Sequence, residues 1–394
     1  MVQQHQQQRR KLIIFWEGTA NTLKPFTTQI GVFSKYCCAK ALSSPSEVPN
    51  DLSDLKLSYV ILRAIIVQQN TLVFFLADIV MSFLLFYVCS FDGCGVTNGT
   101  WGTLFASGLD GQVNLAIQIV KQMLQLQQPS KQGIHVVAVG LSRGAMACMK
   151  LAQKLAQQFT QSEVTSSMLL FDPVPGNAVS TGFPWTARWC QDLSSCHNLL
   201  RVLALYPYEA LPDIAMHAPT LCWYNRETTL VQEDVCMGCH QGALFMPTLV
   251  PRNNYEEAST LSSRRIVDYL EYEGVKCDLP SFFYIPTPQT CIELCEQILR
   301  RPEPHTEALQ RKTHDQTGQH RHILRHASTS KCQWLNRHHE QLVRAVQRQE
   351  EGGGLNAATL EAVFGETSRQ TLKTTINRSY LLDVDDGYVM CGFS

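Results

Sequence analysis

The chain has 394 residues, a net charge of −1 and 45% hydrophobic residues. That length and hydrophobic content suffice for one large domain with an appendage, or for two domains. The near-zero charge gives no argument for binding to nucleic acid or to an acidic membrane surface. The fifteen cysteines lack the spacing of a disulfide framework, which predicts reduced thiols in an intracellular compartment.

The chain begins with a polar segment and a short strand. Residues 1–10 are rich in glutamine and are predicted to form a disordered tail; with no apolar run, they are not expected to be a secretory signal peptide. The apolar run Leu12–Trp16 is typical of a strand and leads into the turn-rich sequence Glu17-Gly-Thr-Ala-Asn. This loop predicts either an oxyanion-binding N–H from Gly18 or Thr19, or an ordinary turn between a strand and a helix.

Residues 57–91 are the most apolar part of the chain. The run 72–89 approaches the roughly 20 residues of a membrane span. Asp78 lies within it, however, and a charge near the bilayer centre is costly. We therefore predict a buried helix followed by a core strand at Phe86–Phe91, with a lid or a membrane span as the alternatives.

The centre of the chain is predicted to form a strand, a sharp turn and a helix. A β-branched apolar run begins at Ile134 and ends in the G-x-S-x-G sequence of residues 140–144, and small apolar residues then recur at helical spacing to about Phe159. This pattern is typical of a nucleophile elbow, where glycines leave room beside the serine and tolerate unusual backbone angles. We predict Ser142 as a nucleophile and the N–H of Arg143 as an oxyanion donor, with a structural serine in a tight turn as the alternative.

Two further buried strands are predicted, each followed by carboxylates. Asp172 directly follows Met168–Phe171, and Glu209 and Asp213 follow Leu199–Leu205. In an open α/β sheet the site lies at the carboxyl ends of the strands. All three acids are therefore candidates for a catalytic role.

A serine hydroxyl is a poor nucleophile at neutral pH unless a histidine accepts its proton and an acid orients that histidine. The order Ser, acid, His along an α/β-hydrolase chain gives Ser142, Asp172 and His240 in this sequence. His240 is expected in a loop after the last candidate strand. His217 is the alternative base, and the other two carboxylates are the alternative acids.

Two patterns point to cofactors, but neither is favoured. Cys236, Cys239 and His240 match the C-x-x-C-H pattern of covalent haem attachment, which normally needs export, and as zinc ligands they lack a clear fourth partner. Residues 305–339 hold seven of the twelve histidines, predicted to be a solvated helical face. We predict no cofactor and no metal.

Five short blocks occur in order along the chain, and their combination is far more specific than any one of them. They are Phe15–Asn21, Phe91–Val96, Gly140–Ala145, Phe171–Val174 and Gly238–His240. Over about residues 11–245 the chain resembles the α/β-hydrolase family, long labelled a domain of unknown function, that includes type VI secretion phospholipase effectors. The resemblance implies a Ser142–Asp172–His240 triad and favours Asp172 over Asp213.

The sequence departs from that family at two places. Glu17 stands where the family usually has aspartate, and Gln241-Gly242 follows His240 where the family typically has an aspartate two residues on and a glycine run. The substrate pocket is therefore expected to differ from that of the phospholipases.

These observations predict an α/β-hydrolase-like, mainly parallel sheet flanked by helices at 11–250, a mostly helical C-terminal region at 251–351, and a linker and tail at 352–394. The predicted function is a serine acyl hydrolase, esterase- or phospholipase-like; the alternative is a catalytically inactive binding module on the same fold. The expected partner is a lipid or small ester, with membrane-surface contact through 57–90 as an option and no nucleic acid. The expected location is cytoplasmic or membrane-associated, or outside the cell by a route that needs no signal peptide.

Overall fold

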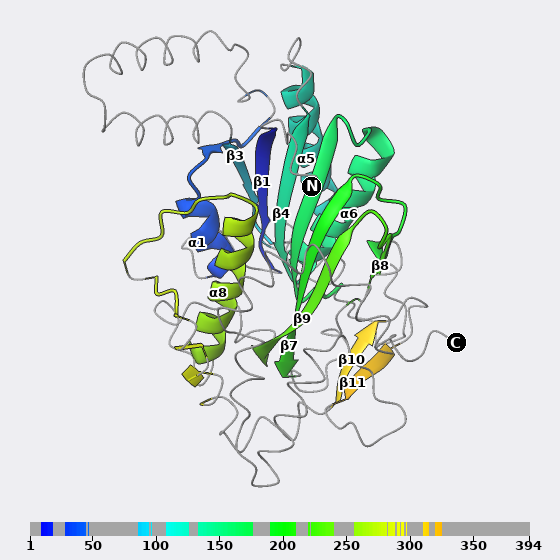
Figure 1. The fold of residues 1–394 in the computed structure, drawn as a ribbon. Coiled ribbons are helices and arrows are strands. Elements are labelled where there is room, and N and C mark those ends of the chain that lie inside the picture. The colour runs from blue at the N-terminus through cyan, green and yellow to red at the C-terminus, as the bar shows by residue number, and fades with distance from the viewer. Residues whose placement is uncertain are drawn as a thin grey trace, which may run out of the picture.

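A seven-stranded sheet forms the centre of the fold (Figure 1). Its order is β2-β3-β1-β4-β5-β7-β9, and every neighbouring pair is parallel. The strands are β1 (Arg10–Trp16), β2 (Lys40–Ala41), β3 (Phe86–Phe91), β4 (Ile134–Leu141), β5 (Val164–Phe171), β7 (Leu199–Glu209) and β9 (Leu230–Cys239). The computed structural model describes residues 9–18, 28–44, 46, 86–93, 96, 108–125, 133–175, 190–209, 220, 222–239, 256–281, 283–287, 290–291, 293–294, 297, 310–314 and 320–324.

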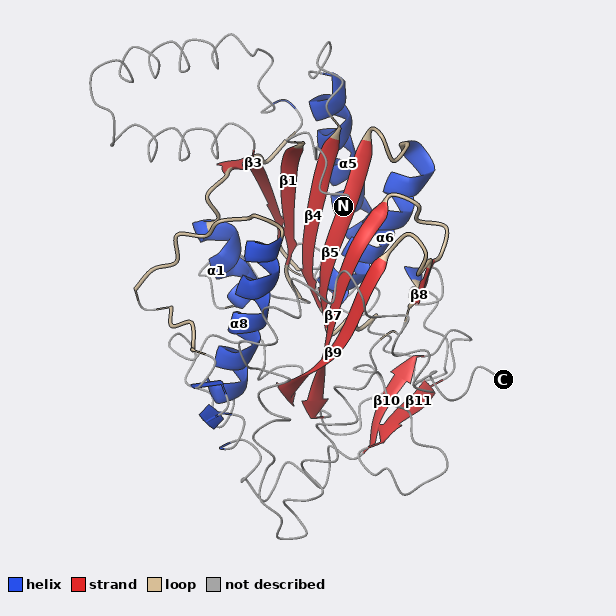
Figure 2. Ribbon diagram, in the orientation of Figure 1, coloured by secondary structure: helices blue, strands red, loops and turns tan. Residues whose placement is uncertain are grey.

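Helices cover both faces of the sheet (Figure 2). One face packs against α5 (Leu109–Gln125) and α6 (Arg143–Gln158), and the other against α1 (Gln29–Tyr36) and α8 (Glu256–Tyr272). Every residue of β4 and β5 is buried, as expected for a parallel sheet covered on both sides. The predicted α/β fold with a mainly parallel sheet flanked by helices is confirmed.

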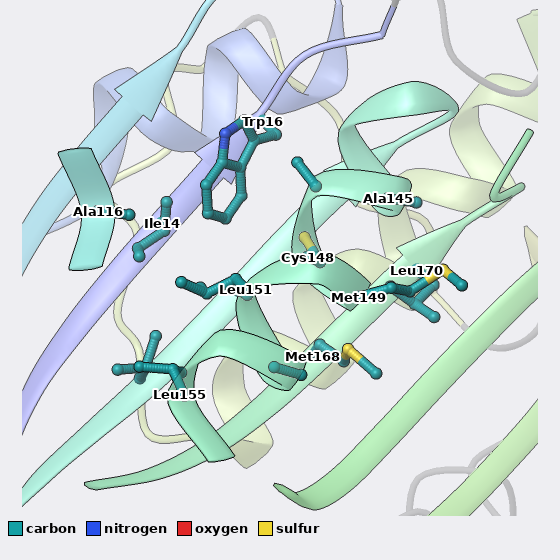
Figure 3. Close-up of a cluster of buried hydrophobic side chains, with 14 of the residues drawn as sticks. Ile14, Trp16, Ala116, Ala145, Cys148, Met149, Leu151, Leu155, Met168 and Leu170 are labelled. Atoms are coloured by element: carbon teal, nitrogen blue, oxygen red, sulfur yellow. The ribbon is translucent and has the colours of Figure 1, made fainter. Parts of the chain in front are cut away.

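Alternation along β1 assigns its side chains to the two faces. Ile14 and Trp16 pack with α5 and α6, and Figure 3 shows both beside Leu151 of α6. Ile13 and Phe15 pack on the opposite face with α1 and α8. Because successive side chains point to opposite faces, the residue that follows Trp16 is directed toward the α1 side.

The chain order reverses beside β1. The chain runs from β1 to β3 on one side and then returns to β4 on the other, with Trp16 level with Phe91 of β3 and Gly140 of β4. In open α/β sheets, ligands bind outside the carboxyl ends of the strands at such a switch point. The loops after β1 and β4 border this position.

The apolar segment is described only at its end. The predicted core strand at Phe86–Phe91 is confirmed as β3. Residues 51–85 lie outside the described residues, so the helix, lid and membrane-span predictions for them stay predictions. Among the residues that are described, no helix is long and apolar enough to cross a membrane.

The C-terminal region differs in part from the helical prediction. Its beginning is helical, as α8, but β10 (Gln310–His314) and β11 (His320–Leu324) form an antiparallel hairpin. The link 315–319 contains aspartate and glycine, which favour tight turns, and its five residues suit a hairpin loop. The histidines of β10 and β11 therefore lie on extended backbone instead of the expected helical face.

A buried charged network holds the end of α8 at the amino ends of the strands. The Arg201 Nε and Nη2 atoms of β7 each donate to the Glu273 carboxylate at 2.8 Å, and Lys11 of β1 donates to the Glu273 carbonyl. Glu273 Oε2 also lies 3.1 Å from His135 Nε2 of β4. Three strands are thereby tied to the residue that follows α8.

Neutral His135 satisfies both of its ring nitrogens in this network. Nε2–H faces Glu273, and Nδ1 lies 2.9 Å from the Thr165 hydroxyl. Burial lowers the pKa of His135, and Glu273 offsets only part of that shift. Burial alone would raise the pKa of Glu273, but His135 and Arg201 bring it below its ordinary range. Glu273 is therefore ionised near neutral pH.

Replacing Glu273 by glutamine is expected to lower the free energy of unfolding by about 3 kcal/mol, because Arg201 loses the charge that compensates its partial burial. Urea denaturation at pH 7 measures the change. The matched control is Glu271→Gln in the last turn of α8, where the exposed side chain predicts a change within about 0.5 kcal/mol. Equal effects of the two variants would contradict the role given to the network.

Candidate active site

Ser142 occupies a strained turn between β4 and α6. Its backbone angles are φ 56° and ψ −118°, a conformation that costs a non-glycine residue about 1–3 kcal/mol. Ser142 precedes α6 at the N-cap position, but its side chain makes no capping hydrogen bond. The strained turn therefore holds a serine hydroxyl that does not cap the helix. A nucleophile elbow has the same arrangement.

The two glycines of the G-x-S-x-G sequence are needed for space. A Cβ atom on Gly140 would overlap with the backbone of Gly144. A Cβ atom on Gly144 would lie 2.5 Å from the Trp16 carbonyl oxygen and 2.7 Å from that of Glu17. The first turn of α6 therefore rests directly on the end of β1. The prediction that no side chain fits beside the serine is confirmed, whereas the left-handed backbone angle belongs to Ser142 itself.

Asp172 lies beside Ser142 at the carboxyl end of β5. Leu141 and Phe171 are register partners, so the two residues that follow them are neighbours across the sheet. The Ser142 N–H donates to the Phe171 carbonyl at 2.8 Å. Asp172 is fully buried and has φ 46°; among the described residues, it and Ser142 are the only non-glycine residues with positive φ.

Arg143 links the elbow to the loop that carries Asp172. Its backbone N–H lies in the first turn of α6, where the helix dipole favours negative charge. Its side chain turns away, and Nε donates to the Pro175 carbonyl at 3.2 Å. The N–H predicted to bind an oxyanion is thus placed by the helix, and the guanidinium secures the 172–175 turn.

Glu17 is a buried carboxyl group at the same edge of the sheet, and sequence reasoning did not select it. It follows β1 and is 1% exposed, and its Oε1 accepts a hydrogen bond from the Thr28 hydroxyl, which caps α1. Its Oε2 is buried without a hydrogen-bond partner among the described residues. The signal was present, because Glu17 directly follows a strand just as Asp172 does.

The environment of Glu17 favours its neutral form. Burial raises the pKa of Glu17 to about 7, although Thr28 and the N–H groups of Gly18 and Gly31 favour the charged form. The charge of Asp92, which follows β3, raises the pKa further.

Several predicted site residues lie outside the described residues, namely Thr19, Asp213, His217 and His240. Glu209 was expected beyond a strand but is the last residue of β7, and Cys236 and Cys239 lie on β9. Leu205 of β7 is level with Phe171, so Glu209 lies about 10 Å further along than Asp172 does. The structure therefore brings Ser142 and Asp172 together and separates Glu209 from them.

A second group of hydroxyl, histidine and carboxylate side chains lies at the opposite end of the sheet. His135 bridges Thr165 through Nδ1 and Glu273 through Nε2, and Ser167 Oγ also lies 3.1 Å from Nε2. Both hydroxyl residues are buried, and Arg9 donates to the Thr165 oxygen at 3.1 Å. Because neither hydroxyl residue has the strained backbone of Ser142, this group is a packing network.

The described residues offer no metal centre, because no three of their histidine, cysteine, aspartate or glutamate side chains are grouped to hold an ion. Nine of the cysteines among them are free thiols. The chemistry available at the described edge of the sheet is therefore that of one hydroxyl, two buried carboxyl groups and the N–H groups of a helix terminus.

Comparison with known proteins identifies no family for the chain. No family model matches the sequence, and no curated protein matches it. Among solved structures, it is similar to an uncharacterized protein from Pseudomonas aeruginosa at a TM-score of 0.40 and 12% identity; the match covers 96% of this chain and 61% of that one. It is also similar to the Tle1 effector bound to the VgrG spike from the Type 6 secretion system at a TM-score of 0.34 and 11% identity, over 90% of this chain and 83% of that one. Likenesses this distant assign no chemistry, which rests on the chain's own residues.

Gly144→Ala is expected to lower the free energy of unfolding by roughly 3 kcal/mol, because the added methyl group meets two backbone carbonyls that cannot yield without moving β1. Gly111→Ala in α5 is the matched control. A methyl group there meets no atom within 4 Å, so the better helix propensity of alanine should raise stability by about 0.5–1 kcal/mol. Urea denaturation of both variants checks the opposite signs.

Glu17 is expected to make stability fall as the pH rises from about 4.5 to about 7. Its pKa is higher in the folded than in the unfolded chain, so the unfolded chain releases the proton first and gains free energy over that interval. Glu17→Gln keeps an acceptor for Thr28 and cannot ionise. The stability of this variant relative to wild type should increase by roughly 3 kcal/mol between those pH values. If the difference in stability between Glu17→Gln and wild type does not vary with pH, the raised pKa assigned to Glu17 is contradicted.

Proposed function

We propose that the chain is a serine acyl hydrolase, with Ser142 as nucleophile, His240 as general base and Asp172 as the acid that orients it. One observation carries the proposal: the two described non-glycine residues with positive φ are neighbours at the carboxyl edge of the sheet, next to the switch point. Strained backbone persists where the surrounding structure enforces it, and it clusters at functional sites. A purely structural serine needs no such strain.

The family resemblance supports the same site. The five blocks follow or end five different strands, namely β1, β3, β4, β5 and β9. Four of these blocks lie along one edge of the sheet, whereas the fifth, Gly238–His240, begins on β9 beyond that edge, where Cys239 is level with Glu209. Blocks that recur for packing alone would have no reason to share the carboxyl ends of the strands.

The proposed reaction follows from the chemistry of these groups. Ser142 Oγ attacks the acyl carbon while His240 takes its proton, and the N–H of Arg143 with one from Gly18 or Thr19 binds the oxyanion. His240 then gives the proton to the leaving alcohol, which leaves an acyl-serine. Water attacks this ester by the same route and releases the carboxylic acid. Buried Asp172 is suited to hold the imidazole because removing a carboxylate from water strengthens its interaction with an imidazolium.

His240 has the longest path to the site. The strand before it, β9, is the third strand beyond β4 and lies about 14 Å from β4 by strand spacing. Both β7 and β9 continue past the ends of the other strands (Figure 1). The proposal therefore requires the chain after Cys239 to fold back over the edge of the sheet toward Ser142.

An apolar acyl ester, such as a phospholipid, is the proposed substrate class. Its support is the family resemblance and the apolar residues 72–85 before β3, which suit a lid or an interfacial helix. The rival is a catalytically inactive binding module on the same fold, motivated by the altered residues after His240. The head group and chain length of the substrate are tested by incubating the protein with mixed-lipid vesicles and measuring which lipids release free fatty acid.

Labelling of the full chain with a fluorophosphonate probe tests the proposal. Wild type should react at Ser142, identified by peptide mass spectrometry, and Ser142→Ala should lose both labelling and hydrolysis of short nitrophenyl esters, by on the order of 10³-fold or more. Ser167→Ala is the matched control, because it removes the serine of the packing network and should label normally. Asp172→Asn and His240→Ala should label far more slowly.

Equal labelling of wild type and Ser142→Ala would overturn the assignment of the nucleophile. Wild type that is folded but inert toward probe, ester and vesicles would favour the binding module. Normal labelling of His240→Ala would show that another base serves Ser142, and His217→Ala would then be the variant to compare.

A further inference from the structure

Two cysteines from distant parts of the chain face each other where α1 and the segment after α8 meet. Cys37 directly follows α1, and Cys277 lies five residues beyond the end of α8. They pair as an isolated antiparallel bridge. On either side of the pair, the Cys38 N–H donates to the Lys276 carbonyl at 2.9 Å, and the Asp278 N–H donates to the Tyr36 carbonyl at 2.8 Å.

This hydrogen-bond pattern fixes the type of pair. Because the neighbours exchange the backbone hydrogen bonds, Cys37 and Cys277 form the non-hydrogen-bonded kind, in which Cα atoms lie about 4.5 Å apart and side chains approach each other. A disulfide needs Cα atoms separated by about 4.4–6.8 Å. Residues on adjacent backbones in this register therefore need little movement to be joined.

The two thiols already interact. The neighbouring Cys37 thiol, followed by burial, raises the pKa of Cys277 above its ordinary value. Cys37 is buried, whereas Cys277 is partly exposed, so an external reagent can reach one sulfur of the pair. Cys38 is also partly exposed, but it is not the register partner of Cys277.

We propose that Cys37 and Cys277 are a disulfide-forming pair that clasps α1 to the segment after α8 when a low-molecular-weight disulfide is available as oxidant. At alkaline pH the ionised fraction of Cys277 attacks one sulfur of the oxidant and expels a small thiolate. The Cys37 thiolate then attacks Cys277 Sγ and expels the second. Two protein thiols lose two electrons and two protons, and the oxidant is reduced to two small thiols.

The clasp would reinforce the elements on one side of the sheet. At its other end α1 carries Thr28, which holds Glu17, and the segment after α8 begins at Glu273, which binds three strands. Joining residues 37 and 277 closes a loop that spans most of the sheet, and long closed loops restrict the unfolded chain most. In a reducing compartment the same residues would stay thiols.

Mass spectrometry of the full chain tests the pair directly. Protein is incubated at pH 8.5 with oxidised glutathione, denatured in an alkylating reagent and digested with trypsin without reduction. Cleavage after lysine and arginine places Cys37 and Cys38 in peptide 36–40, and Cys277 in peptide 277–300 with Cys291 and Cys295. Fragment ions of the linked pair in wild type identify which sulfurs are joined.

The expected result is a link between Cys37 and Cys277 that persists in Cys38→Ser and disappears in Cys277→Ser. Oxidised wild type should melt roughly 5 °C or more above reduced wild type, and Cys37→Ser should show no such difference. A link through Cys38, or full alkylation of Cys37 and Cys277 after incubation with oxidant, would overturn the proposal. The wild-type peptides alone decide the matter if a variant fails to fold.

Discussion

The contact between the first turn of α6 and the end of β1 is the constraint on which the candidate site depends. Gly144 lies against the carbonyl oxygens of Trp16 and Glu17, and the end of β4 at Gly140 lies against Gly144. Helix and strand can approach this closely only if the chain turns within one residue. That residue is Ser142, whose backbone takes up the strain. The same contact places Glu17 beside this turn, so the backbone geometry of Ser142 and the burial of Glu17 have one cause.

The buried glutamates at the two ends of the sheet, Glu273 and Glu17, differ in how their oxygens are paired. At the amino ends, Glu273 accepts hydrogen bonds from Arg201 and faces His135, so both oxygens of this buried carboxylate have partners. At the carboxyl ends, one oxygen of Glu17 is buried without a partner in the described part of the chain, and two residues carry strained backbone. Such violations of local rules are tolerated at functional sites and offset elsewhere in the fold. The paired charges around Glu273 at the amino ends are well suited to stabilise the fold against this strain.

Much of this arrangement could be predicted because the decisive signals are local. The apolar strand, the glycines and the helix around Ser142 lie within about 25 consecutive residues, and a carboxylate after a buried strand marks Asp172. The partnership of His135 and Glu273 joins residues 138 positions apart, and no local pattern encodes it. The extension of β7 through Pro207 was missed because proline usually ends a strand. β5 ends level with Leu205, so beyond it β7 has one neighbour in the sheet and a missing N–H is tolerated.

The position of the site residues also bears on how such a chain can change. Glu17, Asp92, Ser142 and Asp172 each follow the last residue of a strand, so the sheet register alone sets their mutual placement. The lengths of the connections between strands do not enter that placement, and closing a loop twice as long costs only about 0.6 kcal/mol more. Segments such as residues 42–85 can therefore be gained, lost or exchanged during evolution while the edge of the sheet keeps its chemistry. The connections can therefore accept sequence changes that would disrupt the sheet if they fell in the strands.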